Sequence, residues 1–151
     1  MLRIPILLAV ALATGCGGPI SMVPGGELSG PVQATPADWA FSNDHETVQL
    51  ETRPTDPYSV NVWCGAHEGA LYVPTSLILG PDDPNERDWV RFVAEDPRVR
   101  LRIDGVVYEL RAVRVEDPGE REAVRARLLA KYERENDDHA QQAWIFRMEP
   151  R

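Results

Sequence analysis

The chain has few of the residues that build metal sites and disulfides. Its 151 residues include two cysteines, Cys16 and Cys64, and three histidines, so no metal site is indicated. Lysine occurs once, at Lys131, and acidic residues outnumber basic ones by 24 to 16. The formal net charge of -8 repels phosphate backbones, which argues against a nucleic-acid partner. The length suits one domain with a sizeable core.

The apolar run near the N-terminus, over residues 4–13, is too short to cross a bilayer, which takes about 20 apolar residues. Arg3 precedes it, a pattern typical of a signal peptide. The following segment, Ala13-Thr14-Gly15-Cys16, resembles the lipobox of bacterial lipoproteins, although Ala13 stands where leucine is usual. The resemblance implies a signal peptide over residues 1–15 and lipid attachment to Cys16. The alternative is an ordinary cleaved secretion signal with an incidental cysteine.

Lipidation of Cys16 would attach the protein to a membrane, since each buried acyl methylene contributes about 0.8 kcal/mol. Gly17 follows the cysteine, which in enteric-type bacteria is typical of outer-membrane sorting. We therefore expect a cell-envelope location, at the periplasmic face of the outer membrane. Residues 16–34 are rich in Gly, Pro and Ser and predict a flexible tether, which leaves residues 35–151 as the folded domain.

Three segments carry helix-start signals, in which a capping side chain precedes a proline: Thr35-Pro36, Asp83-Pro84 and Asp117-Pro118. They predict a short helix near Trp39, a helix ending before Pro97 and a longer helix up to Tyr132. Period-two alternation predicts six strands. These lie near residues 48–51, 58–62, 70–75, 98–103, 106–111 and 143–148. The order of elements predicts a mainly β, α+β fold.

The two central strands should form a hairpin, because Asp104-Gly105 separates two alternating runs. This register places Arg100 opposite Glu109 as an ion pair and Arg98 opposite Arg111. Like charges that face each other need compensation, for which a protein carboxylate, water or a bound anion could serve. In an acidic chain a carboxylate is the favoured answer.

The alternation changes after the hairpin. Arg114 has the parity of the apolar Tyr108 and Leu110, whereas Val113 and Val115 have the other parity. Either a bulge or a change of sheet face near Ala112 would explain the change.

From Val48 to Met148 the chain resembles the flavin-binding split β-barrel superfamily, the fold of pyridoxamine-phosphate oxidases, and in particular the deazaflavin-dependent nitroreductases. The matching features are Thr75-Ser76 after a strand, the core of the helix at Trp89 to Val93, Asp96-Pro97-Arg98-Val99, and Lys131-Tyr132 at a helix end. The resemblance implies a six-stranded split barrel with flanking helices, an FMN or deazaflavin cofactor and a homodimer.

The resemblance also implies where a cofactor phosphate would bind, namely at Thr75, Ser76, Asn85 and Arg87. The loop lysine usual in the family is absent, and Asp82, Asp83 and Glu86 place carboxylates beside this site, where they oppose an anion. Two functions remain open. One is a flavin- or deazaflavin-dependent oxidoreductase, in which the cofactor carries the hydride and no catalytic side-chain set is needed. The other is a cofactor-free barrel that binds a ligand or a protein.

Cys64 and His67 are the remaining residues with reactive side chains. They lie three residues apart, which is a weak signal for a metal site or for an activated thiol. A small buried hydrophobic side chain is the favoured interpretation of Cys64.

Overall fold

The computed structural model describes residues 17–151, so the predicted signal peptide and Cys16 lie outside the described residues. The strands are β1 (Val32–Gln33), β2 (Thr47–Thr52), β3 (Tyr58–Trp63), β4 (Gly65–His67), β5 (Ala70–Pro74), β6 (Arg98–Ile103), β7 (Val106–Arg114) and β8 (Ile145–Pro150). The α-helices are α1 (Asp88–Glu95), α2 (Pro118–Lys131) and α3 (Asp138–Gln142), and two 3-10 turns are η1 (Ala40–Asp44) and η2 (Pro84–Glu86).

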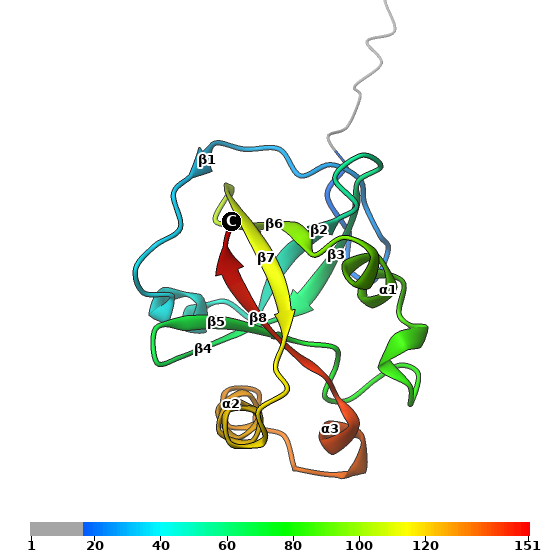
Figure 1. The fold of residues 1–151 in the computed structure, drawn as a ribbon, viewed down its shortest axis with the longest axis vertical. Helices are drawn as coiled ribbons and strands as arrows, with labels where there is room; N and C mark the ends of the chain where they lie inside the picture. The colour runs from blue at the N-terminus through cyan, green and yellow to red at the C-terminus, as the bar shows by residue number, and fades with distance from the viewer. Residues whose placement is uncertain (1–16) are drawn as a thin grey trace, which may run out of the picture.

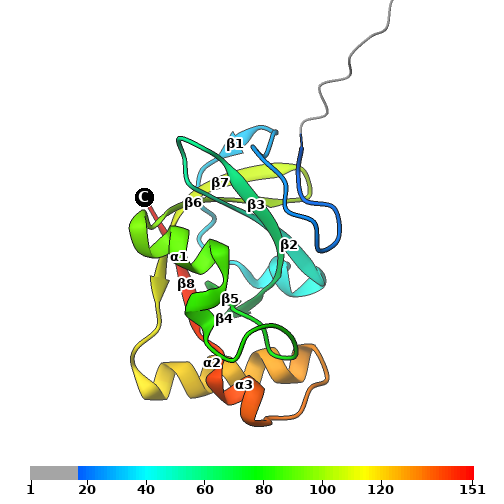
Figure 2. The ribbon, with the colours of Figure 1, turned by 90° about the vertical axis from the view of Figure 1, so that its right-hand side faces the viewer.

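One sheet contains all the strands in the order β3-β2-β6-β7-β8-β5-β4, and β1 adds to β7 in parallel. Figures 1 and 2 show the sheet curling around an interior, with α1 on one side and α2 and α3 together at one end. The expected mainly β barrel with flanking helices is therefore confirmed. The sheet has eight strands rather than the expected six, because β1 and β4 were not predicted.

The two additional strands are short and carry little sequence pattern. β1 has two residues and pairs through main-chain groups, as when the Val107 amide donates to the Pro31 carbonyl at 2.9 Å. β4 follows β3 after a single residue, Cys64, in a segment that was expected to be a connection. Main-chain pairing of this kind does not require alternating side chains, so hydrophobic periodicity could not reveal it.

The hydrophobic core has two parts. The barrel interior holds residues such as Leu50, Leu101 and Leu110. A second cluster includes Val115 and Leu128, and the helices α2 and α3 contribute to it. The apolar side chains that stabilise the fold are therefore buried in two separate clusters.

The second cluster explains the changed alternation in β7. The pairing of β7 with β8 keeps one register through Arg114 opposite Phe146, and the Val115 amide continues it by donating to the Ile145 carbonyl at 2.9 Å. Because this register is unbroken, a bulge is not the cause. The buried face of the strand changes instead, since Val115 is buried in the cluster formed with α2 and α3.

The predicted hairpin register is confirmed, with Ile103 opposite Val106 and Arg98 opposite Arg111. Arg98 is compensated by a carboxylate, as favoured, because its Nη2 lies 2.6 Å from Asp96 Oδ2.

The prediction that Arg100 forms an ion pair with Glu109 across this hairpin was wrong. Arg100 lies opposite Glu109 on the main chain, but its guanidinium pairs with Glu51 of β2 at 3.3 Å. Glu109 instead pairs with Arg151 at 3.5 Å. β6 has β2 as its second neighbour, and that neighbour supplies the more buried carboxylate.

The three predicted helix-start signals lead to different structures. Asp117 caps α2 by accepting from the Glu120 amide, as predicted. Asp83 caps only the 3-10 turn η2, and α1 begins at Asp88 as a separate helix. The short helix expected to begin at Thr35 is the 3-10 helix η1, which begins at Ala40.

The N-terminal segment over residues 17–34 runs along the barrel. Leu28 is fully buried, and Gly25 and Ser59 exchange two main-chain hydrogen bonds of 2.8 Å. The Ser59 hydroxyl also donates to the Gly26 carbonyl at 2.7 Å. These are contacts that a freely moving tether would lack. Across residues 17–151, every helix is too short or too polar to span a membrane.

Candidate functional site

A cleft of about 650 Å³ lies between β3 and the end of β5, beside the start of α1. A volume of this size is typical of pockets for small molecules and cofactors. Its walls come from four parts of the chain: the N-terminal segment, β3, the loop after β5 and the start of α1. The lining residues include Tyr58, Val60, Trp63, Thr75, Ser76, Ile78, Leu79, Glu86, Arg87, Asp88 and Trp89.

Thr75 and Ser76, two of the predicted phosphate ligands, lie together in this cleft. The Thr75 hydroxyl accepts a hydrogen bond of 3.0 Å from the Trp144 amide, which ties the end of β5 to the start of β8. The Ser76 hydroxyl accepts from the Leu79 amide at 3.0 Å and thereby shapes the loop. Each hydroxyl keeps its own hydrogen available for donation to an anion.

Arg87, a further predicted phosphate ligand, also lines the cleft, but part of its guanidinium is already in use. Its Nη2 donates to the Leu79 carbonyl, and burial lowers the pKa of the side chain. Asn85 is not among the lining residues; its amide groups bond to Asp83 within the η2 turn. The structure therefore brings together three of the four predicted ligands.

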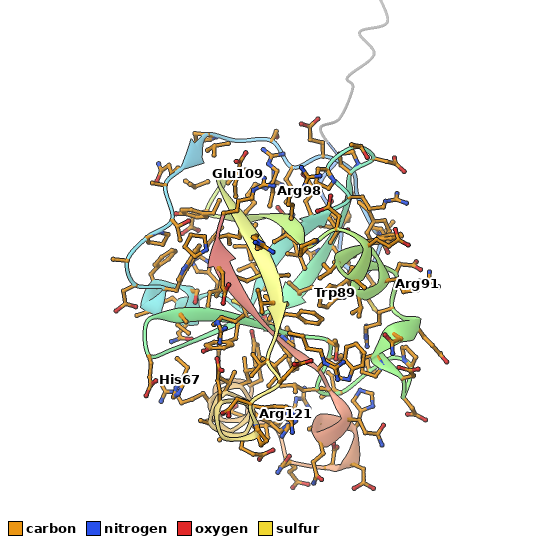
Figure 3. All side chains as sticks on the ribbon, viewed as in Figure 1. His67, Trp89, Arg91, Arg98, Glu109 and Arg121 are labelled. Atoms are coloured by element: carbon orange, nitrogen blue, oxygen red, sulfur yellow. The ribbon has the colours of Figure 1, made fainter. Side chains whose placement is uncertain are left out.

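The cleft combines aromatic walls with carboxylates. Tyr58, Trp63 and Trp89 give it flat apolar surfaces, and Figure 3 labels Trp89, the second residue of α1. Glu86 and Asp88 line the same space. Burial and the nearby Asp88 carboxylate raise the pKa of Tyr58. Such a cleft suits a planar ring well, whereas an anionic group there meets one arginine and two carboxylates.

Arg98 and Arg111, the predicted anion contacts, do not line this cleft. Arg98 is held by Asp96, and Figure 3 shows it at the end of the barrel away from α2. The like-charge pair is thus accounted for by a neighbouring carboxylate.

Cys64 is a buried structural residue, as favoured from the sequence. Its thiol is fully buried and donates to the Ser42 carbonyl at 3.7 Å, and burial is the main reason that its pKa is raised. A protonated thiol is a poor nucleophile. His67 lines a separate hollow of about 210 Å³ between β4 and α2. Within the described residues, no group of three or more His, Cys, Asp or Glu side chains is arranged to hold a metal.

Lys131 and Tyr132, which matched the family at the helix end, clamp the corner between β3 and β4. Lys131 Nζ donates to the carbonyls of His45 and Cys64, both at 2.7 Å, and to that of Ser42 at 3.2 Å. The Tyr132 hydroxyl accepts from the Cys64 amide at 2.9 Å, and its ring stacks on Trp63 at 4.0 Å. Trp63 is thereby fixed as a wall of the cleft.

An exposed apolar rim borders the cleft, and reasoning from the sequence missed it. Met22 is 83% exposed, Val23 66% and Leu79 55%, and all three line the cleft; the neighbouring Ile20 is 77% exposed. Met22 and Leu79 are 57 positions apart in the sequence, so no local pattern could bring them together. Exposed apolar residues that cluster in this way mark interaction surfaces.

No family model matches the chain, and no curated protein matches it. Several solved structures do. One is the conserved hypothetical protein Rv2991 from Mycobacterium tuberculosis, with 21% identity and a TM-score of 0.56 over 74% of this chain and 76% of that chain. A putative pyridoxamine 5'-phosphate oxidase from Listeria innocua has 17% identity and a TM-score of 0.54 over 74% and 88%. An F420-H2 dependent reductase has 17% identity and a TM-score of 0.55 over 70% and 95%.

Proposed function

From the split β-barrel fold that this chain shares with flavin- and deazaflavin-associated proteins, we propose that it is an oxidoreductase-like protein of the cell envelope that binds a flavin or deazaflavin in the cleft beside β3. The observation that carries the proposal is the cleft itself. Its lining includes the aromatic side chains of Trp63 and Trp89 as well as the hydroxyl-bearing Thr75 and Ser76. A cofactor with a flat ring and a polar tail requires these two kinds of surface in one space.

Different lining residues would hold the ring and the tail of such a cofactor. Tyr58, Trp63 and Trp89 offer surfaces for the ring, and Thr75, Ser76 and Arg87 offer donors to the tail. The bound group would supply the hydride chemistry, while the barrel excludes water and orients the ring. Glu86 and Asp88 lie near the same donors, so we expect weak binding of a phosphate-bearing tail.

The same carboxylates favour the second candidate function. A barrel whose anion site is crowded by Glu86 and Asp88 suits a neutral or cationic ligand better than a phosphate. In this alternative the protein is a cofactor-free ligand- or protein-binding module that kept the barrel.

The visible spectrum of the purified protein, followed by titration with FMN and with a deazaflavin, tests the redox proposal. We expect a bound cofactor to raise the melting temperature. Val60→Trp should abolish this rise, because Val60 lines the cleft and the larger ring would fill it.

Thr55→Trp is the matched control, since it adds the same ring to the exposed turn between β2 and β3 and should leave the response unchanged. A colourless protein whose melting temperature ignores both cofactors would overturn the redox proposal and favour the binding module.

We also propose that the protein is anchored to a membrane through Cys16. Gly17, the next residue, lies at the start of the segment that carries the exposed Ile20, Met22 and Val23. A lipid at Cys16 would therefore hold the apolar rim close to the membrane, where its burial is favourable.

The anchor predicts that the protein sediments with the membrane fraction and that mass spectrometry finds acyl chains on Cys16. Cys16→Ser should move the protein to the soluble fraction, whereas Cys64→Ser should not, because the Cys64 thiol is buried inside the fold. An unmodified Cys16 in the membrane fraction, or cleavage at another residue, would remove the anchor from the proposal.

A further inference from the structure

A second cleft, of about 450 Å³, is lined by residues of α2 and α3, which lie together at one end of the molecule (Figure 1). It is predominantly polar and does not share lining residues with the cleft beside β3. Three arginines line it: Arg114 from the end of β7, and Arg121 and Arg125 from α2. Figure 3 shows Arg121 of α2 at this end of the molecule.

Arg125 forms the fixed part of this arginine cleft. Its side chain is buried, at 3% exposure, and donates to the carbonyls of Ala140 at 3.1 Å and Gln141 at 3.2 Å. Its carboxylate partner is Glu122, whose side chain is 64% exposed. Arg125 thus holds α3 against α2. Its positive charge lies in the lining of the cleft, and its carboxylate partner within residues 17–151 is the exposed Glu122.

Arg114 and Arg121 are the cations available to a ligand. Across residues 17–151, neither of them lies within 4.0 Å of a carboxylate. The Arg114 guanidinium carbon lies 3.3 Å from the centre of the Trp144 ring, a stacking contact that orients the group and leaves its edge N–H groups free. Arg121 makes one weak hydrogen bond, of 3.4 Å, to the Glu116 carbonyl.

Arg114 is the residue that breaks the alternation of β7, and the arginine cleft accounts for its position. Its parity directs it to the same side as Tyr108 and Leu110, but at the end of the strand it meets Trp144 rather than the core. The Arg114 side chain is exposed apart from its stacking contact with Trp144. Its placement is better suited to recognition of a ligand.

The charge of the cleft points to an anion. Three arginines against one carboxylate, Glu122, leave a formal excess of two positive charges among the lining residues, in a chain whose net charge is -8. The backbone carbonyl of Glu116 faces Arg121, and the side chain of this residue is exposed. Asn136, Gln141 and Gln142 add amide donors to the wall. Guanidinium groups with free edges bind phosphate or carboxylate oxygens in pairs.

We propose that the arginine cleft binds a soluble small molecule through a phosphate group, held between Arg114 and Arg121. The described chain begins at the end of the molecule opposite α2 and α3 (Figures 1 and 2). The choice of a soluble ligand rests on the anchor at Cys16 proposed above, because a surface at the end opposite residue 17 is poorly placed to meet the lipid headgroups of that membrane.

Titration of the purified protein with inorganic phosphate at constant ionic strength, followed by calorimetry and tryptophan fluorescence, tests this site. We expect saturable binding that chloride does not reproduce. Arg114→Gln and Arg121→Gln should each weaken it by about tenfold or more, the effect of losing one charged hydrogen-bond partner. Trp144→Phe should remove the fluorescence change while calorimetry still detects binding.

Arg111→Gln is the matched control, because Arg111 lies on the same strand, is exposed and is absent from the cleft. Equal weakening by all three substitutions, or no saturable binding, would overturn the proposal. A second arm adds vesicles of anionic phospholipid to the Cys16→Ser protein. Co-sedimentation that depends on Arg114 would show that the phosphate is a lipid headgroup and would overturn the assignment to a soluble ligand.

Discussion

Arg100→Met is expected to lower the free energy of unfolding by about 3 kcal/mol, which is the lower end of the range for removing one partner of a buried ion pair. The reason is the position of its partner: Glu51 is 3% exposed, and Arg100 Nη1 lies 3.3 Å from its Oε2. The substitution leaves a carboxylate in the protein interior whose remaining hydrogen-bond donor is the Leu28 amide. Urea unfolding followed by far-ultraviolet circular dichroism measures the change.

The same substitution should loosen the N-terminal segment. Arg100 Nη1 also donates to the Leu28 carbonyl at 3.0 Å, so Glu51 and Arg100 together bind both main-chain groups of this residue. Leu28 is itself fully buried. We therefore expect hydrogen exchange at the Leu28 amide to accelerate in Arg100→Met before the barrel strands are affected.

Two comparisons separate the buried pair from ordinary surface charge. Arg98→Met is the control on the same strand, and it should have a much smaller effect because Arg98 and Asp96 are exposed. Glu51→Gln keeps an acceptor for Leu28 and removes the buried charge, so the double variant with Arg100→Met should recover part of the lost stability. Equal losses for Arg98→Met and Arg100→Met would contradict a desolvated Glu51.

Lys131→Met should lower the free energy of unfolding by about 2–3 kcal/mol, since hydrogen bonds to a charged group contribute about 1.5–3 kcal/mol each and some of the freed carbonyls keep other donors. The ammonium group joins three main-chain carbonyls: those of Ser42 in η1, of His45 between η1 and β2, and of Cys64 at the corner between β3 and β4. Methionine preserves the apolar stem but offers no donor.

Lys131→Arg should rescue this loss only in part, because a planar guanidinium cannot aim its donors at three carbonyls as a compact ammonium does. Arg127→Met is the matched control on the same helix, since Arg127 is exposed and, across residues 17–151, makes no ion pair. Thermal unfolding monitored by circular dichroism compares the three proteins. A loss in Arg127→Met as large as that in Lys131→Met would show that the helix surface, and not the corner, carries the effect.

The contacts of Lys131 and Tyr132 at this corner also support one wall of the cleft beside β3. The Tyr132 ring stacks on Trp63, and its hydroxyl is anchored to Cys64 next to the Lys131 contacts. Trp63 forms part of the cleft wall. The residue pair that resembled the family motif at the helix end therefore stabilises the wall of the cleft without entering it.

Most strands and the longest helix could be predicted from the sequence, because their signals are local. Asp104-Gly105 determines the hairpin register, and Asp117-Pro118 determines the start of α2. Turn chemistry and capping act over two to four residues, so one sequence contains all the information that they need. The grouping of Thr75, Ser76 and Arg87 was also predicted, through a resemblance whose motifs lie close to these residues.

Other features were decided by tertiary structure alone, because they depend on residues far apart in the chain. Arg100 pairs with Glu51 rather than Glu109, since the second neighbour of β6 is β2 and not a segment next to the hairpin. The apolar rim joins Met22 to Leu79, and the arginine cleft joins Arg114 to α2 and Trp144. Local chemistry thus specifies which strands and helices form, whereas their packing selects which side chains share a buried or hollow space, and the apolar rim and the arginine cleft belong to that second category.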